Sequence, residues 1–169
     1  MNDTPHKTPQ DEQETETVFQ LIYASAATRE LEPAELEKIL AAARRNNQPA
    51  GITGMLVYHE GSFLQVLEGD RELVEALYEK IELDDRHTNA FILLRSEDAE
   101  RCFERWSMGF SRPTEDQKRE IPGLNDFLRV GFTKPAPGQE TELESRGQTA
   151  RKILLAFREG RWHRSVDGA

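Results

Sequence analysis

Cysteine is nearly absent from the 169-residue sequence, in which Cys102 is the only example. A single thiol excludes an internal disulfide and a thiolate metal cluster, and such usage is typical of a reducing compartment. Long apolar runs are also lacking, since no segment approaches the roughly 20 apolar residues of a membrane span. The first 16 residues lack the basic-then-apolar order of a signal peptide. We therefore expect a cytoplasmic protein without a membrane partner.

Motifs for phosphate, metal and nucleophile chemistry are missing as well. The sequence contains no Gly-rich phosphate loop, no His-x-x-x-His or Glu-x-x-His pattern and no Gly-x-Ser-x-Gly elbow. Its four histidines are scattered, and most carboxylates fall on the solvated faces of predicted helices. The sequence therefore predicts no metal site and no catalytic residue, and we expect the protein not to be an enzyme.

Basic residues are too few to balance the acidic ones: 22 Lys and Arg stand against 31 Asp and Glu, a net charge of -9. Such a charge opposes nonspecific binding to nucleic acid. The excess is not uniform, because residues 111–169 hold 11 basic and 9 acidic side chains. The argument against a nucleic-acid partner therefore holds for the core and weakens for this C-terminal part.

Composition divides the chain into three parts. Residues 1–16 hold two prolines and five acids with little to bury, which predicts a disordered acidic leader. Residues 17–110 form the predicted folded domain, and residues 111–169 a C-terminal helical extension. Its last helix, predicted over 142–158, is basic and places Ala150, Ile153, Leu154 and Phe157 on one face. This helix either docks on its own domain or is freed to bind an acidic partner.

Hydrophobic periodicity in the folded part predicts alternating strands and helices. The predicted strands are 18–23, 52–58, 62–68, 91–94 and a short one at 107–110, with helices at 33–47 and 71–83. The order βαββαβ is that of a ferredoxin-like α+β sandwich, in which two helices cover one face of the sheet. The opposite face then needs a cover, which the C-terminal extension can supply.

Four polar residues occupy positions where apolar ones would pack better. Strand alternation places Gln65 on the face of Phe63 and Leu67. Helical spacing places Asn47 and Asp84 on the sides of the two predicted helices that face the interior. Tyr23 ends the first strand near the same region. Three of them have a structural alternative: Asn47 as a helix C-cap, Gln65 satisfied at a strand edge, and Tyr23 as a core tyrosine. Together they indicate a cleft for a flat ligand with polar edges.

Six separated blocks resemble one known family in order and spacing. They are Leu-Ile-Tyr-Ala-Ser at 21–25, Arg-Asn-Asn at 45–47, Gly-Ile-Thr-Gly at 51–54, Phe-Leu-Gln-Val-Leu-Glu-Gly at 63–69, Asp-Asp-Arg-His at 84–87 and Trp-Ser-Met at 106–108. The pattern resembles the BLUF domain, a blue-light sensor that uses flavin, from about residue 17 to residue 110. The resemblance implies a ferredoxin-like fold with an oxidised flavin, usually FAD and in some members FMN, between the two helices.

Site residues are implied by the same resemblance. Tyr23 resembles the photoactive tyrosine, and Gln65 resembles the glutamine that links it to the flavin. The other implied cofactor-binding residues are Asn46, Asn47, Lys80, Asp84, Arg86 and His87. Trp106 and Met108 match a pair on the last strand that can exchange places near Gln65 and relay the signal.

The sequence departs from some family members at two positions. Ala43 stands where some have a serine that supports the glutamine, and Lys80 stands where others have an arginine. Lysine keeps the charge but loses the planar fork of arginine. Neither change removes the expected group of Tyr23, Gln65 and flavin.

The resemblance implies light-driven signalling through the C-terminal helices. The partner would be an unidentified downstream signalling protein, or the output would be a change of assembly such as homo-oligomer formation. A flavin or small-ligand module without light signalling is the main alternative. An acylphosphatase-like hydrolase on the same sandwich is weaker, because no anion-binding loop with an Arg and an Asn is visible.

Overall fold

A computed structural model of the chain describes residues 16–104 and 107–158. Its elements follow in the order β1 (Thr17–Ala27), α1 (Pro33–Asn47), β2 (Thr53–His59), β3 (Ser62–Gly69), α2 (Arg71–Leu83), β4 (His87–Glu100), β5 (Gly109–Ser111), α3 (Glu115–Glu120), α4 (Leu124–Val130) and α5 (Glu140–Arg158). The predicted βαββαβ order is therefore confirmed, with three further helices after it.

One sheet organises the molecule, with strand order β4-β1-β3-β2-β5. The strands β4, β1, β3 and β2 pair antiparallel, and the short β5 joins β2 in parallel. The first four form the sheet of a ferredoxin-like fold, which confirms the predicted class. Both β4 and β5 are edge strands, so each has one unpaired side.

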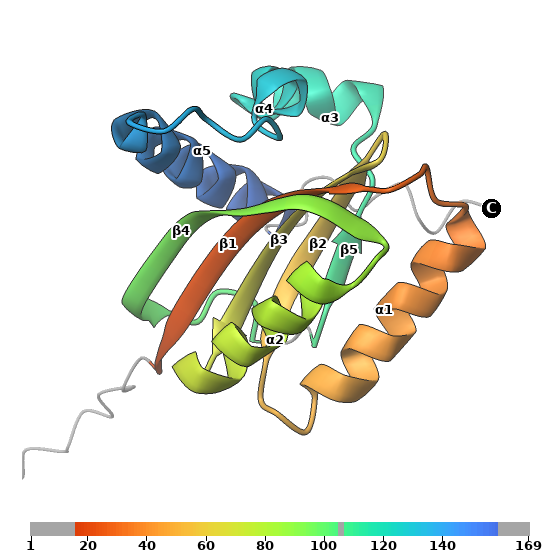
Figure 1. Cartoon of the computed structure of the whole chain (residues 1–169), viewed down its shortest axis with the longest axis vertical. Helices are drawn as coiled ribbons and strands as arrows, with labels where there is room; N and C mark the ends of the chain where they lie inside the picture. Colours follow the sequence, from red (N-terminus) through yellow and green to blue (C-terminus); the bar gives the residue numbers. More distant parts are fainter. Residues whose placement is uncertain (1–15, 105–106, 159–169) are drawn as a thin grey trace, which may run out of the picture.

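Two apolar cores lie on opposite faces of this sheet. Figure 1 shows α1 and α2 on one side, with α3, α4 and α5 on the other. Alternate residues of β3 serve the two cores, since Phe63 and Leu67 pack toward α1 and α2 while Leu64 and Val66 pack toward α5. The C-terminal helices thus cover the second face, as the sequence predicted.

Residues at the helix starts explain where α1 and α2 begin. Pro33 occupies the first turn of α1, where its missing N–H costs nothing, and the Glu32 N–H donates to Glu35 Oε2 at 2.9 Å. Asp70 caps α2, with its Oδ1 accepting from the N–H groups of Glu72 and Leu73 at 3.0 and 3.2 Å. Both starts are therefore set by residues next to the helix.

Several predicted boundaries were wrong. The first strand does not end at residue 23, because β1 continues to Ala27, paired with β3 and β4. The fourth strand is 14 residues long rather than four, and it begins at His87, four residues before the predicted start at Phe91. Its polar residues are tolerated because β4 is an edge strand. The last strand lies at 109–111 rather than 107–110.

The final helix, α5, packs its apolar stripe against the sheet. Ala150, Ile153, Leu154 and Phe157 are all at most 1 % exposed. A Cβ added at Gly147 would lie 2.3 Å from the Leu93 carbonyl oxygen of β4, so helix and strand backbones meet there. The structure thus shows this helix docked on its own domain.

The predicted leader falls mostly outside the described residues. Of residues 1–16, the structure describes Glu16, whose carboxylate lies 3.0 Å from Arg101 Nη2. The Glu16 carbonyl also accepts from the Arg101 N–H at 3.3 Å. This residue is therefore joined to the folded part.

Candidate ligand-binding site

A cleft of about 220 Å³ lies between α1 and α2, above the middle of the sheet. Apolar side chains of both helices form its walls, and Tyr23, Leu56, Phe63 and Gln65 line it from the strands. It is lined by every predicted cofactor-binding residue, Tyr23, Asn46, Asn47, Gln65, Lys80, Asp84, Arg86 and His87, and by Met108. The fold thus brings together residues separated by up to 85 positions in the chain.

Three side chains form a hydrogen-bonded line inside the cleft. The Tyr23 hydroxyl donates to Gln65 Oε1, and Gln65 Nε2 lies 3.3 Å from Met108 Sδ. Their placement follows from register, because Tyr23 and Gln65 are direct partners across β1 and β3. Burial raises the pKa of the Tyr23 hydroxyl far above its usual value, and the nearby Tyr78 and Asp84 raise it further. Tyr23 is therefore a neutral phenol at physiological pH.

The segment leading into β5 is held against the cleft by α1. Asn47 Nδ2 donates to the Ser107 carbonyl at 3.1 Å, and Arg44 Nε donates to the Met108 carbonyl at 2.9 Å. Asn47 is 2 % exposed, which confirms its inward position, and the helix C-cap is Gln48 instead. Trp106, the predicted exchange partner of Met108, lies outside the described residues.

Charged residues gather at the end of α2. The Arg86 guanidinium binds the Asp84 carboxylate through Nε at 3.0 Å and Nη2 at 2.6 Å. This pairing holds the pKa of Asp84 at about 2. Burial lowers the pKa of His87, and Arg86 lowers it further while Asp84 opposes both. His87 is therefore neutral at pH 7, with Nδ1 3.0 Å from Ser25 Oγ.

The residues at the cleft mouth are more exposed. Lys80 on α2 and Asn46 on α1 are both exposed and both line the cleft. Lys80 therefore supplies positive charge beside the opening, and Asn46 supplies an amide. Their roles toward a ligand stay predictions.

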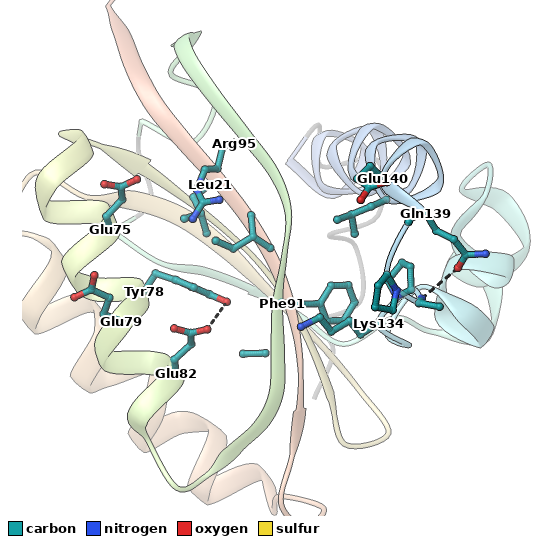
Figure 2. Close-up of a pocket in the computed structure, with 17 residues that line it drawn as sticks. Leu21, Glu75, Tyr78, Glu79, Glu82, Phe91, Arg95, Lys134, Gln139 and Glu140 are labelled. Carbon is teal, nitrogen blue, oxygen red and sulfur yellow. Dashed lines mark hydrogen bonds between the residues drawn. The ribbon is translucent and has the colours of Figure 1, made fainter.

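A larger groove of about 740 Å³ lies elsewhere, around the outer edge of β4 (Figure 2). Its lining includes four carboxylates and two cations, Glu75, Glu79, Glu82, Glu140, Arg95 and Lys134. An excess of carboxylates disfavours a ligand with phosphates. We therefore assign the candidate site to the smaller cleft, where amides, an imidazole and cations converge on an apolar slot.

The cleft residues fit a flavin by their chemistry. An isoalloxazine ring is flat and apolar on its faces, with carbonyl oxygens and ring nitrogens at its edge, and apolar helix walls suit such faces. The Gln65 amide donates to a thioether sulfur, which is a weak acceptor. A carbonyl or ring nitrogen in the cleft would offer this buried donor a stronger acceptor, and Lys80 suits a phosphate at the mouth.

Other ligand classes find less support in the described part of the chain. Within residues 16–104 and 107–158, no group of three or more His, Cys, Asp or Glu side chains could hold a metal ion. Over the same ranges, no helix is both long and apolar enough to cross a membrane.

The chain is a ferredoxin-like domain whose candidate ligand site is the cleft between the two helices that cover one face of the sheet. A sequence model of the BLUF family, described as sensors of blue-light using FAD, matches residues 18–109. The chain belongs to this family. FAD, or FMN in some members, is the cofactor of BLUF domains.

A curated relative is the photoactivated adenylate cyclase subunit beta of Euglena longa. It is 35% identical over 113 residues, which cover 66% of this chain and 13% of that protein. The chain thus spans only a small part of the length of such relatives.

Two solved structures resemble this chain over most of its length. One shows the BlsA photo-activated state, with a TM-score of 0.63 and 30% identity, covering 83% of this chain and 94% of that one. The other shows BlrB, a BLUF protein in its dark state, with a TM-score of 0.60 and 27% identity, covering 84% and 98%. The likeness therefore extends beyond the matched family region.

Two residues near the site escaped the sequence argument. Arg44 lies on an exposed turn of α1 and looked like an ordinary solvated charge, yet it holds the Met108 carbonyl. Glu68 follows Gln65 by three residues and is fully buried. Its signal was available, because a carboxylate inside an apolar strand needs donors.

Proposed function

We propose that this chain is a blue-light photoreceptor in which Tyr23 and Gln65 convert light absorption into a change of hydrogen bonding. The hydrogen bond from the buried Tyr23 hydroxyl to Gln65 Oε1 at the floor of the cleft carries the proposal. The bound flavin supplies the light absorption and, once excited, the oxidising power. Asn46, Asn47, Lys80, Asp84, Arg86 and His87 hold it in the cleft.

Tyr23 is placed to give up an electron and its phenolic proton. Burial disfavours the phenolate, so the proton leaves together with the electron. Gln65 Oε1 accepts that proton along the existing hydrogen bond, and Gln65 would relay a proton to the flavin, which would take the electron. When Tyr23 recovers its electron and proton, Gln65 is left rotated or in its tautomeric form, with different donors and acceptors.

The altered amide changes what holds Met108. Gln65 Nε2 contacts Met108 Sδ at 3.3 Å in the structure, and a reversed amide would turn its oxygen toward the sulfur. The segment before β5 is then biased between two arrangements, because a buried polar group must keep its hydrogen bonds satisfied. This segment continues through β5 into α3, which connects the switch to the C-terminal helices.

We propose that these helices pass the signal to a separate protein or to a change of assembly, and that the chain itself is not an enzyme. Residues 146–164 hold six Arg or Lys side chains against a single acid, Glu159, and this basic run suits an acidic partner. Truncation at Thr133 tests the proposed signalling through the C-terminal helices. The truncated protein should lose the difference in partner affinity between dark and light, and an unchanged difference would contradict it.

Absorption spectroscopy of matched variants tests the proposed photochemical role of Tyr23 and Gln65. Tyr23→Phe and Gln65→Leu should keep the flavin but lose the reversible red shift after blue light. Tyr58→Phe is the control, because Tyr58 is an equally buried tyrosine whose hydroxyl binds the Leu31 N–H at 3.0 Å, outside the cleft lining. A full red shift in Tyr23→Phe would refute the relay. A yellow wild-type protein without any spectral change would favour the non-signalling flavin module.

A further inference from the structure

Glu68 is a buried carboxylate to which the proposed photochemistry assigns no role. It is 0 % exposed and lies on β3, three residues after Gln65. Because the separation is odd, its side chain points to the opposite face of the sheet, toward the core that α5 covers. The same strand thus carries a switch residue on one face and a buried acceptor on the other.

Four donors from three separate parts of the chain converge on this carboxylate. Oε1 accepts from Gln20 Nε2 at 2.9 Å and from the Cys102 N–H at 2.8 Å. Oε2 accepts from Thr53 Oγ1 at 3.2 Å and from the Phe103 N–H at 2.9 Å. A carboxylate without such donors would be costly to bury, so these contacts fix the 101–103 loop firmly to the sheet.

The 101–103 loop lies at a junction between sensor and output. It follows β4 and precedes the Ser107–Met108 segment, which Asn47, Arg44 and Gln65 contact from the cleft side. On its other side Arg158 Nη1 of α5 lies 3.3 Å from the Cys102 carbonyl. Phe103 is packed in the same core as Phe157 of α5. The loop therefore contacts the last turn of α5 directly.

We propose that Glu68 is a positioning residue that fixes the 101–103 loop as a pivot, so that movement of Ser107–Met108 is transmitted to the end of α5. This inference rests on the proposed photoreceptor function. With the pivot fixed, a displacement beyond residue 104 must act on the contacts of Phe103 and Arg158. Without the contacts to Glu68, the loop itself can move, and the displacement does not reach α5.

The variant Glu68→Gln weakens the attachment of the 101–103 loop to the sheet with little change of side-chain volume. Each carboxylate oxygen accepts one main-chain N–H, from Cys102 or from Phe103. An amide has only one oxygen, so whichever way it turns, its NH₂ group faces one of these N–H donors. Main-chain donors cannot turn away. We expect the 101–103 loop to become more mobile, while the cleft side chains on the opposite face of the sheet keep their arrangement.

The test records the red shift and the light-minus-dark hydrogen exchange of α5 amides on the same purified full-length samples. Wild type should show both responses. Glu68→Gln should keep the red shift and lose most of the light-minus-dark response of α5, because one main-chain donor of the loop is left without an acceptor. Glu100→Gln is the matched control, since Glu100 is an exposed carboxylate beside the same loop, and it should keep both responses.

A second variant covers the case in which Glu68→Gln does not fold. Arg158→Met removes the exposed α5 contact to the loop and should also keep the red shift while weakening the α5 response. A folded Glu68→Gln protein with the wild-type α5 response would overturn the inference, as would an unchanged response in Arg158→Met. A wild type with a red shift but no α5 response would overturn it too. A wild type without a red shift would overturn the proposed function itself.

Discussion

At Gly147 the backbone of α5 lies close to the backbone of β4, so the sign of the stability change on substitution by alanine tests whether α5 is docked there. A Cβ there would lie 2.3 Å from the Leu93 carbonyl oxygen and 3.0 Å from its carbonyl carbon. Both neighbours are backbone atoms of a paired strand and cannot rotate away. The helix would have to move outward by about 1 Å to restore normal van der Waals contact.

Two opposing effects determine how much Gly147→Ala changes the free energy of unfolding. In an exposed helix interior, Gly→Ala stabilises by about 1 kcal/mol through helix propensity. Overpacking at a tight contact costs about 1–3 kcal/mol, and here the shift also loosens Ile153 and Leu154, which are at most 1 % exposed. We expect a net loss of about 1–2 kcal/mol, with a fall in Tm of about 2–4 °C for each kcal/mol.

Thermal unfolding of the dark protein measures this change. Gln148→Ala is the matched control, because Gln148 is the exposed next residue of α5 and should shift stability by less than about 0.5 kcal/mol. If Gly147→Ala raised Tm, as an exposed helix substitution does, α5 would not be docked at this point. The route from loop to α5 would then lose its basis.

Three further outcomes test other parts of the site. Asp84 has a pKa of about 2 when paired with Arg86 and about 3.9 when unpaired, so its stabilising effect is present above about pH 4 and is lost as pH falls toward 2. Urea unfolding of Asp84→Asn should therefore differ from wild type at pH 7, and this difference should fall by about half near pH 3 and nearly vanish near pH 2. Met108→Leu keeps volume but removes the sulfur that contacts Gln65, so we expect a changed dark-recovery rate with the red shift retained; an unaltered rate would argue against the contact. Asn47→Ala leaves a carbonyl of the segment before β5 without its donor and should cost about 1–3 kcal/mol in urea unfolding, whereas no loss would show that water replaces the amide.

Periodicity was sufficient to predict the layers of the fold and the direction of the central polar residues. The alternation around Gln65 and the helical spacing to Asn47 correctly placed both side chains in the interior, because each rule depends only on local geometry. The length of β4 could not be predicted in this way, since an edge strand needs no apolar alternation on its open side. Its start at His87 depends on pairing with Ala27, 60 residues earlier.

Long-range hydrogen bonds account for what the sequence did not reveal. The sequence marks Glu68 as a carboxylate in an apolar strand that needs donors, but those donors come from β1, β2 and the 101–103 loop, which no local pattern indicates. Arg44 lies on the polar side of α1 by periodicity, yet its long side chain reaches the Met108 carbonyl. The resemblance supplied the cofactor, but the contacts that link the cleft to the C-terminal helices became visible only in three dimensions.

One measurement tests the central claim most directly: the visible absorption spectrum of the purified full-length protein before and after blue light, followed by extraction and identification of the flavin. We predict a yellow protein containing FAD or FMN, a red shift of its flavin bands after illumination and full recovery in the dark. A flavin-loaded protein whose spectrum is the same before and after blue light would contradict the assignment of Tyr23 and Gln65 as a light-driven switch.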